Sequence, residues 1–230
     1  TQSVVGGEQT FAVTIDVDDS LEENPSGCFP TVDPGGTGTV NPSLIIDCLD
    51  FGMRFTGITI PQGTTITSAF IDLISRRIAG GPTNTTIVGQ LIDDASVILA
   101  PSCPTCPLFT GSFFSSTFDI TGRDETTASV AWNGVPVAGT GVTLTSPDVS
   151  SIVQEIVDRP GWASGNDMFF RFQNASLSAY REFLSFEDGS TVAPRIRITI
   201  PSSGSSVEGD DQMIALRFTD LNIPQGATLT

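Results

Sequence analysis

The chain of 230 residues contains no histidine and no lysine, and it has only one tyrosine and two tryptophans. The missing histidine removes the usual general base and the commonest transition-metal ligand. The missing lysine removes the side chain that forms imines with carbonyl substrates. Two carboxylates could still serve a glycosidase, but no motif singles out such a pair among the 26 acidic residues. We therefore predict that the protein is not an enzyme.

Positive charge is scarce as well. Ten arginines stand against 26 acidic residues, which gives a formal net charge of −16. A protein without a row of basic side chains lacks the positive charges that bind nucleic-acid phosphates or an anionic membrane surface. No window of the sequence approaches the run of about 18 apolar residues that spans a bilayer. We therefore expect no nucleic-acid partner and no insertion into a membrane.

The four cysteines are Cys28, Cys48, Cys103 and Cys106. They allow three complete disulfide pairings, of which the simplest joins Cys28 to Cys48 and Cys103 to Cys106. The first bridge would close a loop of about 20 residues and contribute about 3 kcal/mol. A four-cysteine zinc site ranks second, because Cys28 and Cys48 lack close cysteine neighbours, and a redox site at Cys103-Pro-Thr-Cys106 ranks last, because its surroundings are typical of a loop. Disulfides indicate an oxidising compartment, so we expect an extracellular or cell-surface protein.

The remaining composition is that of turn-rich β structure, with 23 glycines and 15 prolines. Residues 10–17 predict a strand, because apolar side chains alternate at 11, 13, 15 and 17. Similar patterns predict strands over 43–48, 51–58, 65–74, 85–92, 112–120, 128–132, 141–144, 168–172, 182–186 and 194–200. Short strands separated by frequent turns are typical of an all-β, antiparallel two-sheet sandwich.

One segment departs from the strand pattern and predicts a helix over about 147–158. Its apolar residues follow the i, i+3, i+4, i+7, i+8 spacing of an amphipathic helix: Val149, Ile152, Val153, Ile156 and Val157. We expect Ser146 as the N-cap, Pro147 at the first helical position and Pro160-Gly161 as the stop. The charged residues are expected to form a solvated face: Glu155, Asp158 and Arg159.

Residues 51–67 and 214–230 are repeats of each other. Nine of the seventeen positions are identical, and the offset of 163 residues is the size of a domain. We therefore predict a repeat domain over 1–200, a linker over 201–213 and the opening strands of a second repeat over 214–230. The apolar residues expected to mediate assembly in the second repeat are Leu216, Phe218 and Ile223.

The second repeat needs a partner, because a lone apolar strand exposes its side chains and backbone groups to water. Two arrangements meet this need. Either the polypeptide continues into a complete second domain, or the strand inserts into the next subunit by β-strand addition. Both make head-to-tail contacts with further copies of the protein, and such contacts form an open filament when they do not close.

Four runs of the sequence resemble a DNRLRE-type domain: GMRFTGITIPQGTTITSAFIDL, TTASVAWNGVPV, SPDVSSIVQEIVDRPGWASGNDMFFRF and REFLSFEDGSTVAPRIRITI. The resemblance covers residues 51–200. It implies a jelly-roll-like β-sandwich of the kind found, often in tandem, in secreted and surface proteins. Relatives of such domains include carbohydrate-binding modules, so the resemblance also implies a polysaccharide as a candidate partner.

Two sets of residues are candidates for ligand binding. The densest acidic segment contains Asp16, Asp18, Asp19 and Glu22, whose oxygens suit Ca²⁺, although a solvated turn explains them equally well and the EF-hand spacing is absent. Further candidate ligands with weaker support are Asp93-Asp94, Glu187-Asp188 and Asp210-Asp211. The candidates for stacking on a sugar are Tyr180, Trp162 and Trp132, and packing inside the sandwich is the favoured alternative for both tryptophans.

The leading hypothesis from the sequence is a structural repeat module of an extracellular fibre, stalk or adhesin that assembles head to tail. The alternative is a carbohydrate-binding module of a secreted protein. No cofactor is expected apart from the candidate Ca²⁺ ion.

Overall fold

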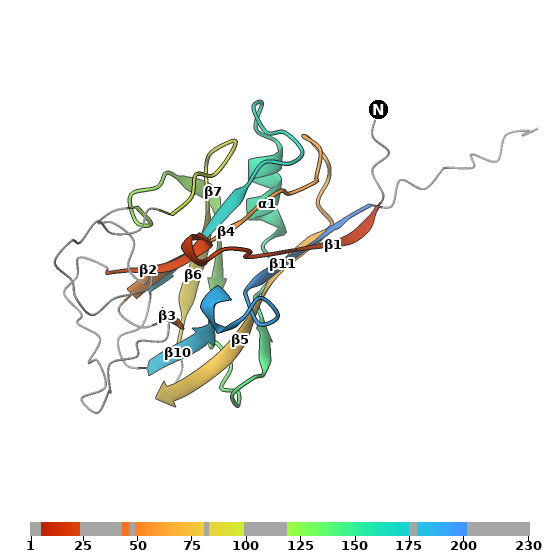
Figure 1. Ribbon diagram of the computed structural model, residues 1–230. Helices are drawn as coiled ribbons and strands as arrows, with labels where there is room; N and C mark the ends of the chain where they lie inside the picture. Colours follow the sequence, from red (N-terminus) through yellow and green to blue (C-terminus); the bar gives the residue numbers. More distant parts are fainter. Residues whose placement is uncertain are drawn as a thin grey trace, which may run out of the picture.

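The computed structural model describes residues 6–23, 43–46, 49–80, 83–98, 119–174 and 179–201. These residues form two antiparallel β-sheets that pack against each other, with a single α-helix among the described elements (Figure 1). The predicted all-β, two-sheet sandwich is therefore confirmed.

The strands, in chain order, are β1 (Gly7–Ala12), β2 (Asp19–Glu23), β3 (Ser43–Ile46), β4 (Leu49–Phe55), β5 (Ser68–Gly80), β6 (Thr85–Gln90), β7 (Glu125–Trp132), β8 (Thr143–Thr145), β9 (Met168–Asn174), β10 (Ala179–Leu184) and β11 (Arg195–Ile200). The helices are α1 (Ser150–Val157) and two 3₁₀ turns, η1 (Asp16–Asp18) and η2 (Phe186–Asp188). One sheet has the order β1-β11-β5-β10-β3, with β8 also paired to β5, and the other has the order β2-β4-β9-β6-β7.

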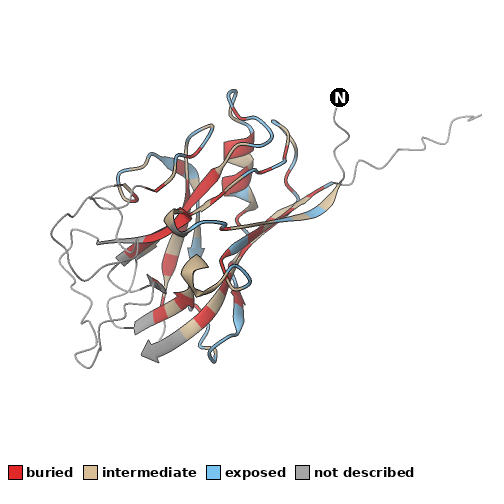
Figure 2. Cartoon of the chain, in the orientation of Figure 1, coloured by how far each residue is buried: buried red, intermediate tan, exposed pale blue. Residues whose placement is uncertain are grey.

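The core lies between the two sheets and depends on the alternation of apolar side chains along the strands (Figure 2). Phe51 of β4 and Phe172 of β9 stack with their ring centroids 4.5 Å apart, and Phe183 of β10 joins them from the opposite sheet. Trp132, at the end of β7, packs edge-on against Phe172. These aromatic contacts join both sheets into one hydrophobic core.

Helix α1 is shorter than predicted, but it buries the predicted apolar face. Ile152, Val153 and Ile156 are buried, and the helix packs mainly on β7 and also on β6 and β5. At the start of the helix, Asp148 Oδ1 accepts a hydrogen bond from the Ser150 N–H over 2.8 Å, which satisfies one of the N–H groups that have no partner within the helix. Among the described helices, none is long and apolar enough to cross a membrane.

The prediction that Ser146 caps the helix is wrong. Ser146 Oγ accepts a hydrogen bond from the Ile71 N–H over 2.9 Å and donates one to the carbonyl of Pro147 over 2.8 Å. The Ser146 side chain therefore bonds to β5 and not to the helix. The N-cap residue is Val149, which makes no side-chain capping bond.

The prediction of one strand over 10–17 is also wrong at its second half. Strand β1 ends at Ala12, and residues 16–18 form the 3₁₀ turn η1. The following acidic residues form β2, which pairs antiparallel with β4 so that Asp19 lies opposite Met53. The alternation of apolar residues continues past Ala12 although the chain leaves the sheet there, which is why the pattern overextends the strand.

Candidate functional site

The first repeat, residues 51–67, runs from one sheet of the sandwich to the other. Its first part belongs to β4, which is bordered by β2 on one side and β9 on the other. Its second part forms the connection from β4 in one sheet to β5 in the other. The repeat therefore contains one of the connections between the two sheets, and we treat it and its contacts as the candidate functional site.

Arg54 is the charged centre of this segment. Its Nε donates to Asp18 Oδ1 over 2.6 Å, and its Nη1 donates to Asp167 Oδ2 over 2.7 Å and to the carbonyl of Ala95 over 3.2 Å. Asp167 in turn accepts a hydrogen bond at Oδ1 from the Gly57 N–H over 2.8 Å. The guanidinium thus joins η1, β4 and two loops that are distant in the sequence.

The turn of the repeat docks on the C-terminal end of α1. Gly63 has a φ of 69°, in the left-handed region that glycine adopts without strain. Its N–H donates to the carbonyl of Val157 over 3.1 Å, and Gln62 Nε2 donates to the carbonyl of Arg159 over 2.7 Å. Carbonyls at the end of a helix lack partners within the helix, so the turn supplies the donors that they need.

Three of the six remaining identical positions of the repeat also have a structural role. Phe55 and Ile60 are completely buried, and the Thr67 N–H donates to the carbonyl of Thr199 over 2.8 Å. The positions shared by both repeats that have such a buried or bonded role here are Arg54, Phe55, Ile60, Gln62, Gly63 and Thr67. The second repeat has therefore kept the residues that bind the rest of a domain.

The acidic segment differs from the solvated turn that was the alternative to a Ca²⁺ site. Asp18 and Asp19 are buried, so the solvated turn is wrong for these two residues. Asp18 pairs with Arg54, and Asp19 Oδ2 accepts a hydrogen bond from the Phe186 N–H over 2.9 Å. The side chains of Asp16 and Glu22 lie outside the described residues, so a Ca²⁺ site that includes them stays a prediction. In the described part of the chain, no three acidic, histidine or cysteine side chains are placed to hold a metal ion.

Asp19 occupies an unfavourable place for a negative charge. Only 3% of the residue is exposed, and within the described ranges its Oδ1 atom has no hydrogen-bond partner. Burial raises the pKa of Asp19 well above its usual value, and the negative charges of Glu187, Asp18 and Asp188 raise it further. The carboxyl group therefore holds its proton more tightly than an exposed aspartate does.

The weaker candidate ligands have structural partners where the structure describes them. Asp93 Oδ1 pairs with Arg159 Nε over 2.7 Å, and Asp94 Oδ1 accepts a hydrogen bond from the Asp167 N–H over 2.9 Å. Asp188 forms an ion pair with Arg76 and caps η2. These carboxylates connect loops to one another. The remaining candidates, Asp210-Asp211, lie outside the described residues.

Two residues of α1 and its C-terminal extension have roles that the sequence did not predict. Glu155 accepts hydrogen bonds from the N–H groups of Thr127 and Ala128 over 2.8 and 2.7 Å, so it caps the open edge of β7. Arg159 pairs with Asp93, as described above. The expectation of an uninvolved solvated face at Glu155 and Arg159 is therefore wrong, because both side chains reach loops or strands packed beside the helix.

The two tryptophans are in the core. Trp132 is 5% exposed and Trp162 is 3% exposed, and Trp162 Nε1 donates to the carbonyl of Ile60 over 2.8 Å. Neither ring offers a face on which a sugar could stack, which corrects their assignment as sugar-binding residues and agrees with the packing alternative. The third candidate, Tyr180, lies in β10, and its side chain is outside the described set.

Several predictions fall outside the described residues. They are the disulfides of Cys28, Cys48, Cys103 and Cys106, the strand over 112–120 except for its last two residues, and the second repeat with Leu216, Phe218 and Ile223. These remain predictions. Asp119 and Ile120 lie in a turn, so the predicted strand is wrong at its end. Comparison of the chain with protein-family models and with curated protein sequences found no match.

Proposed function

We propose that the protein is a structural repeat module of an extracellular fibre, stalk or adhesin, joined head to tail to further modules of its own kind. The observation that carries the proposal is the role of the repeated residues. Arg54, Gln62 and Gly63 bind partners from distant parts of the chain, and all three are identical in the second repeat. A segment that keeps such residues is suited to build the same kind of domain a second time.

The two ends of the described module lie close together, which supports a connection to neighbouring modules at one place. In the antiparallel pair of β1 and β11, Gly7 lies opposite Ile200, so the chain enters and leaves the sandwich at one corner (Figure 1). The residues after β11 have the sequence PSSGSSVEGDDQM, whose serine, glycine and acidic content is typical of a linker. Neighbouring modules would therefore be attached near the β1–β11 corner.

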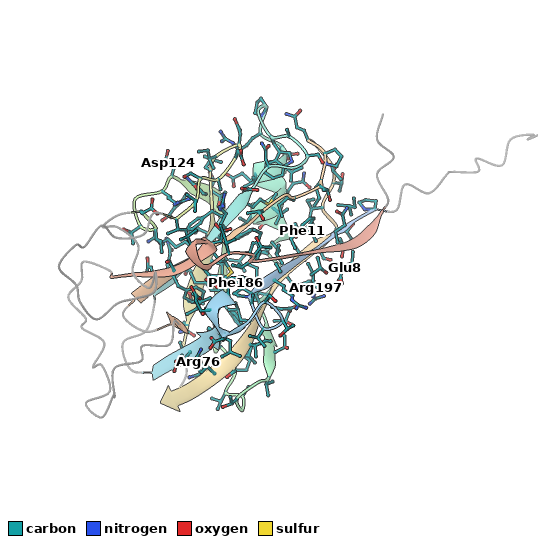
Figure 3. All side chains as sticks on the ribbon, viewed as in Figure 1. Glu8, Phe11, Arg76, Asp124, Phe186 and Arg197 are labelled. Atoms are coloured by element: carbon teal, nitrogen blue, oxygen red, sulfur yellow. The ribbon has the colours of Figure 1, made fainter. Side chains whose placement is uncertain are left out.

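The same corner is held by an arginine between three strands. Arg197 of β11 pairs through Nη1 with Glu8 of β1 over 3.0 Å and through Nε with Asp72 of β5 over 2.6 Å (Figure 3). Burial alone would raise the pKa of Asp72, but hydrogen bonds from Arg197 and Thr145 outweigh it and lower the pKa. Strand β11, which ends where the linker begins, is thus held by ion pairs as well as by backbone pairing.

The polar groups of the site fit a structural role better than a catalytic one. Asp18 and Asp167 are both engaged by Arg54, and Asp50 pairs with Arg171 Nε over 2.7 Å. Carboxylates held in this way by guanidinium groups connect strands and loops.

The proposal is tested on the native polypeptide. Intact-mass measurement and sequencing of the protein from its source should reveal further modules that contain the motif of residues 54–63, and electron microscopy should show linear assemblies. Labelling of thiols without reduction should leave all four cysteines unmodified, as expected outside the cell. A free-standing soluble monomer with one module would overturn the proposal.

A further inference from the structure

The repeat of residues 51–67 contains a glycine that has no room for a side chain. A Cβ atom built on Gly52 would lie 2.6 Å from Cε2 of Phe169 and still closer to Cζ, which is well inside the contact distance of real Cβ atoms. Gly52 and Phe169 belong to the neighbouring strands β4 and β9. The close approach of the ring to the β4 backbone therefore depends on glycine at this position.

The ring of Phe169 cannot move aside without breaking other contacts. The residue is 1% exposed and belongs to a small hydrophobic cluster with Ala95, Ile98 and Ile120. The guanidinium of Arg123 lies over the ring, 4.3 Å from its centroid. A methyl group at position 52 would therefore push a packed ring against its neighbours.

The second repeat has alanine where the first has this glycine. At an offset of 163 residues, Ala215 corresponds to Gly52 and Ile214 corresponds to Phe51. Phe51 stacks on Phe172 at 4.5 Å, so isoleucine in its place would also lose an aromatic contact. Ile214 and Ala215 of the second repeat therefore do not fit the place that Phe51 and Gly52 occupy in this module.

We propose that residues 214–230 pair with a separate module, in which a residue smaller than phenylalanine stands at the position of Phe169, and not with residues 6–201 of another copy of this module. The inference rests on the proposed function, since it identifies the partner of the second repeat. Of the two modes of head-to-tail assembly, it selects a tandem domain and rejects strand exchange between identical modules.

The first experiment uses two chimaeras of the 1–230 chain. In one, the residues of 214–230 replace all of 51–67; in the other, they replace only 53–67, so that Phe51 and Gly52 are kept. We expect the first chimaera to lose cooperative thermal unfolding or to melt about 5 °C or more below the second. Loss of folding in both would place the mismatch outside positions 51 and 52 and would overturn the proposal as argued. Equal melting temperatures, both close to that of the parent chain, would overturn it.

The second experiment measures the contact itself by a double-mutant cycle. Gly52→Ala should lower the melting temperature, whereas Gly139→Ala, where a Cβ meets nothing within 4 Å, should leave it nearly unchanged. Phe169→Leu in the Gly52→Ala background should recover part of the loss, so that the two shifts are not additive. A Gly52→Ala variant that melts with the parent chain would overturn the proposal.

The oligomeric state separates this inference from the proposed function. Light scattering on the purified 1–230 chain should show no dimer in which 214–230 has replaced 51–67 of a partner, and finding such a dimer would overturn the inference while leaving head-to-tail assembly intact. Conversely, a native polypeptide with one module would overturn the proposed function, but the mismatch measured in the chimaeras would stand.

Discussion

The Nε atom of Arg54 donates a hydrogen bond to Oδ1 of Asp18 over 2.6 Å, between side chains that are 12% and 0% exposed. The two residues are 36 positions apart, and the contact joins the turn η1 to the strand β4. Both charges have left most of their water, so the attraction between them offsets part of the cost of burying them. The ion pair therefore attaches the N-terminal segment to the sandwich, which we call its fastening role.

Replacing Arg54 by alanine should destabilise the protein by about 3–5 kcal/mol, because the buried carboxylate of Asp18 would lose the positive charge of the guanidinium. Asp167 would lose the same guanidinium. Urea unfolding followed by tryptophan fluorescence measures the change, and the exposed Arg195, whose Nη2 donates to the carbonyl of Thr191, provides the control Arg195→Ala. A loss at Arg54 no larger than the loss at Arg195 would contradict the fastening role.

The contact between β6 and α1 gives a second prediction. A Cβ atom on Gly89 would lie 2.6 Å from Cγ2 of Ile152 and 3.0 Å from Cδ1 of Ile156. Gly89→Ala should therefore overpack the interface of helix and sheet and cost about 1–3 kcal/mol. Differential scanning calorimetry checks this, with Gly139→Ala as the control in open space. If the two variants melt at the same temperature, the helix is not packed on Gly89 as described.

The apolar pattern of the sequence predicted the face of this helix well. Ile152, Val153 and Ile156 follow helical spacing and are buried as expected. The strands were placed mostly to within a few residues for a similar reason, since alternation reflects which side of a strand faces the core. Burying one face of a helix or strand requires apolar residues at a regular spacing, and this spacing can be read directly from the sequence.

The polar contacts of the site could not be predicted in this way. Glu155 reaches residues 27 and 28 positions away, and Arg54 reaches Asp167 over 113 positions. Such pairs depend on which strands become neighbours, and no local pattern records that. One signal was available for Arg54: its identity with Arg217 in the second repeat showed that the charge belongs to the shared design of both segments.

The edge of β7 supplies a third prediction. Both carboxylate oxygens of Glu155 accept backbone N–H groups, from Thr127 and Ala128. In Glu155→Gln one of these N–H groups would face an amide donor, so we expect a loss of about 1–3 kcal/mol. Hydrogen exchange should show faster exchange at Thr127 and Ala128 than in the parent protein. Ser151→Ala, at an exposed position of the same helix, is the control and should leave these amides protected.

The last prediction concerns Asp19 and the dependence of stability on pH. Burial, followed by the charge of Glu187, raises the pKa of Asp19 in the folded protein. A group whose pKa is raised on folding contributes stability that is fully present below its unfolded pKa of about 3.9 and is lost as the pH rises through the folded value. Asp19→Asn has no charge to bury and can still accept the hydrogen bond from Phe186. The variant should therefore be more stable than the parent protein at pH 7, and the difference should shrink as the pH falls towards 4.

Asp148 provides a matched control, because replacing it by asparagine should change the stability at pH 7 in the opposite direction. Burial would raise its pKa, but hydrogen bonds from the N–H groups of Ala69 and Ser150 outweigh it and lower the pKa. Its contribution is present above the unfolded pKa and is lost as the pH falls through the folded value. Asp148→Asn should thus be less stable than the parent protein at pH 7 and approach it in acid. Thermal melts of the parent and both variants between pH 3 and 8 measure the two differences. If Asp19→Asn instead loses stability at pH 7, as Asp148→Asn does, the folded protein stabilises the carboxylate of Asp19. That result would contradict a raised pKa of Asp19.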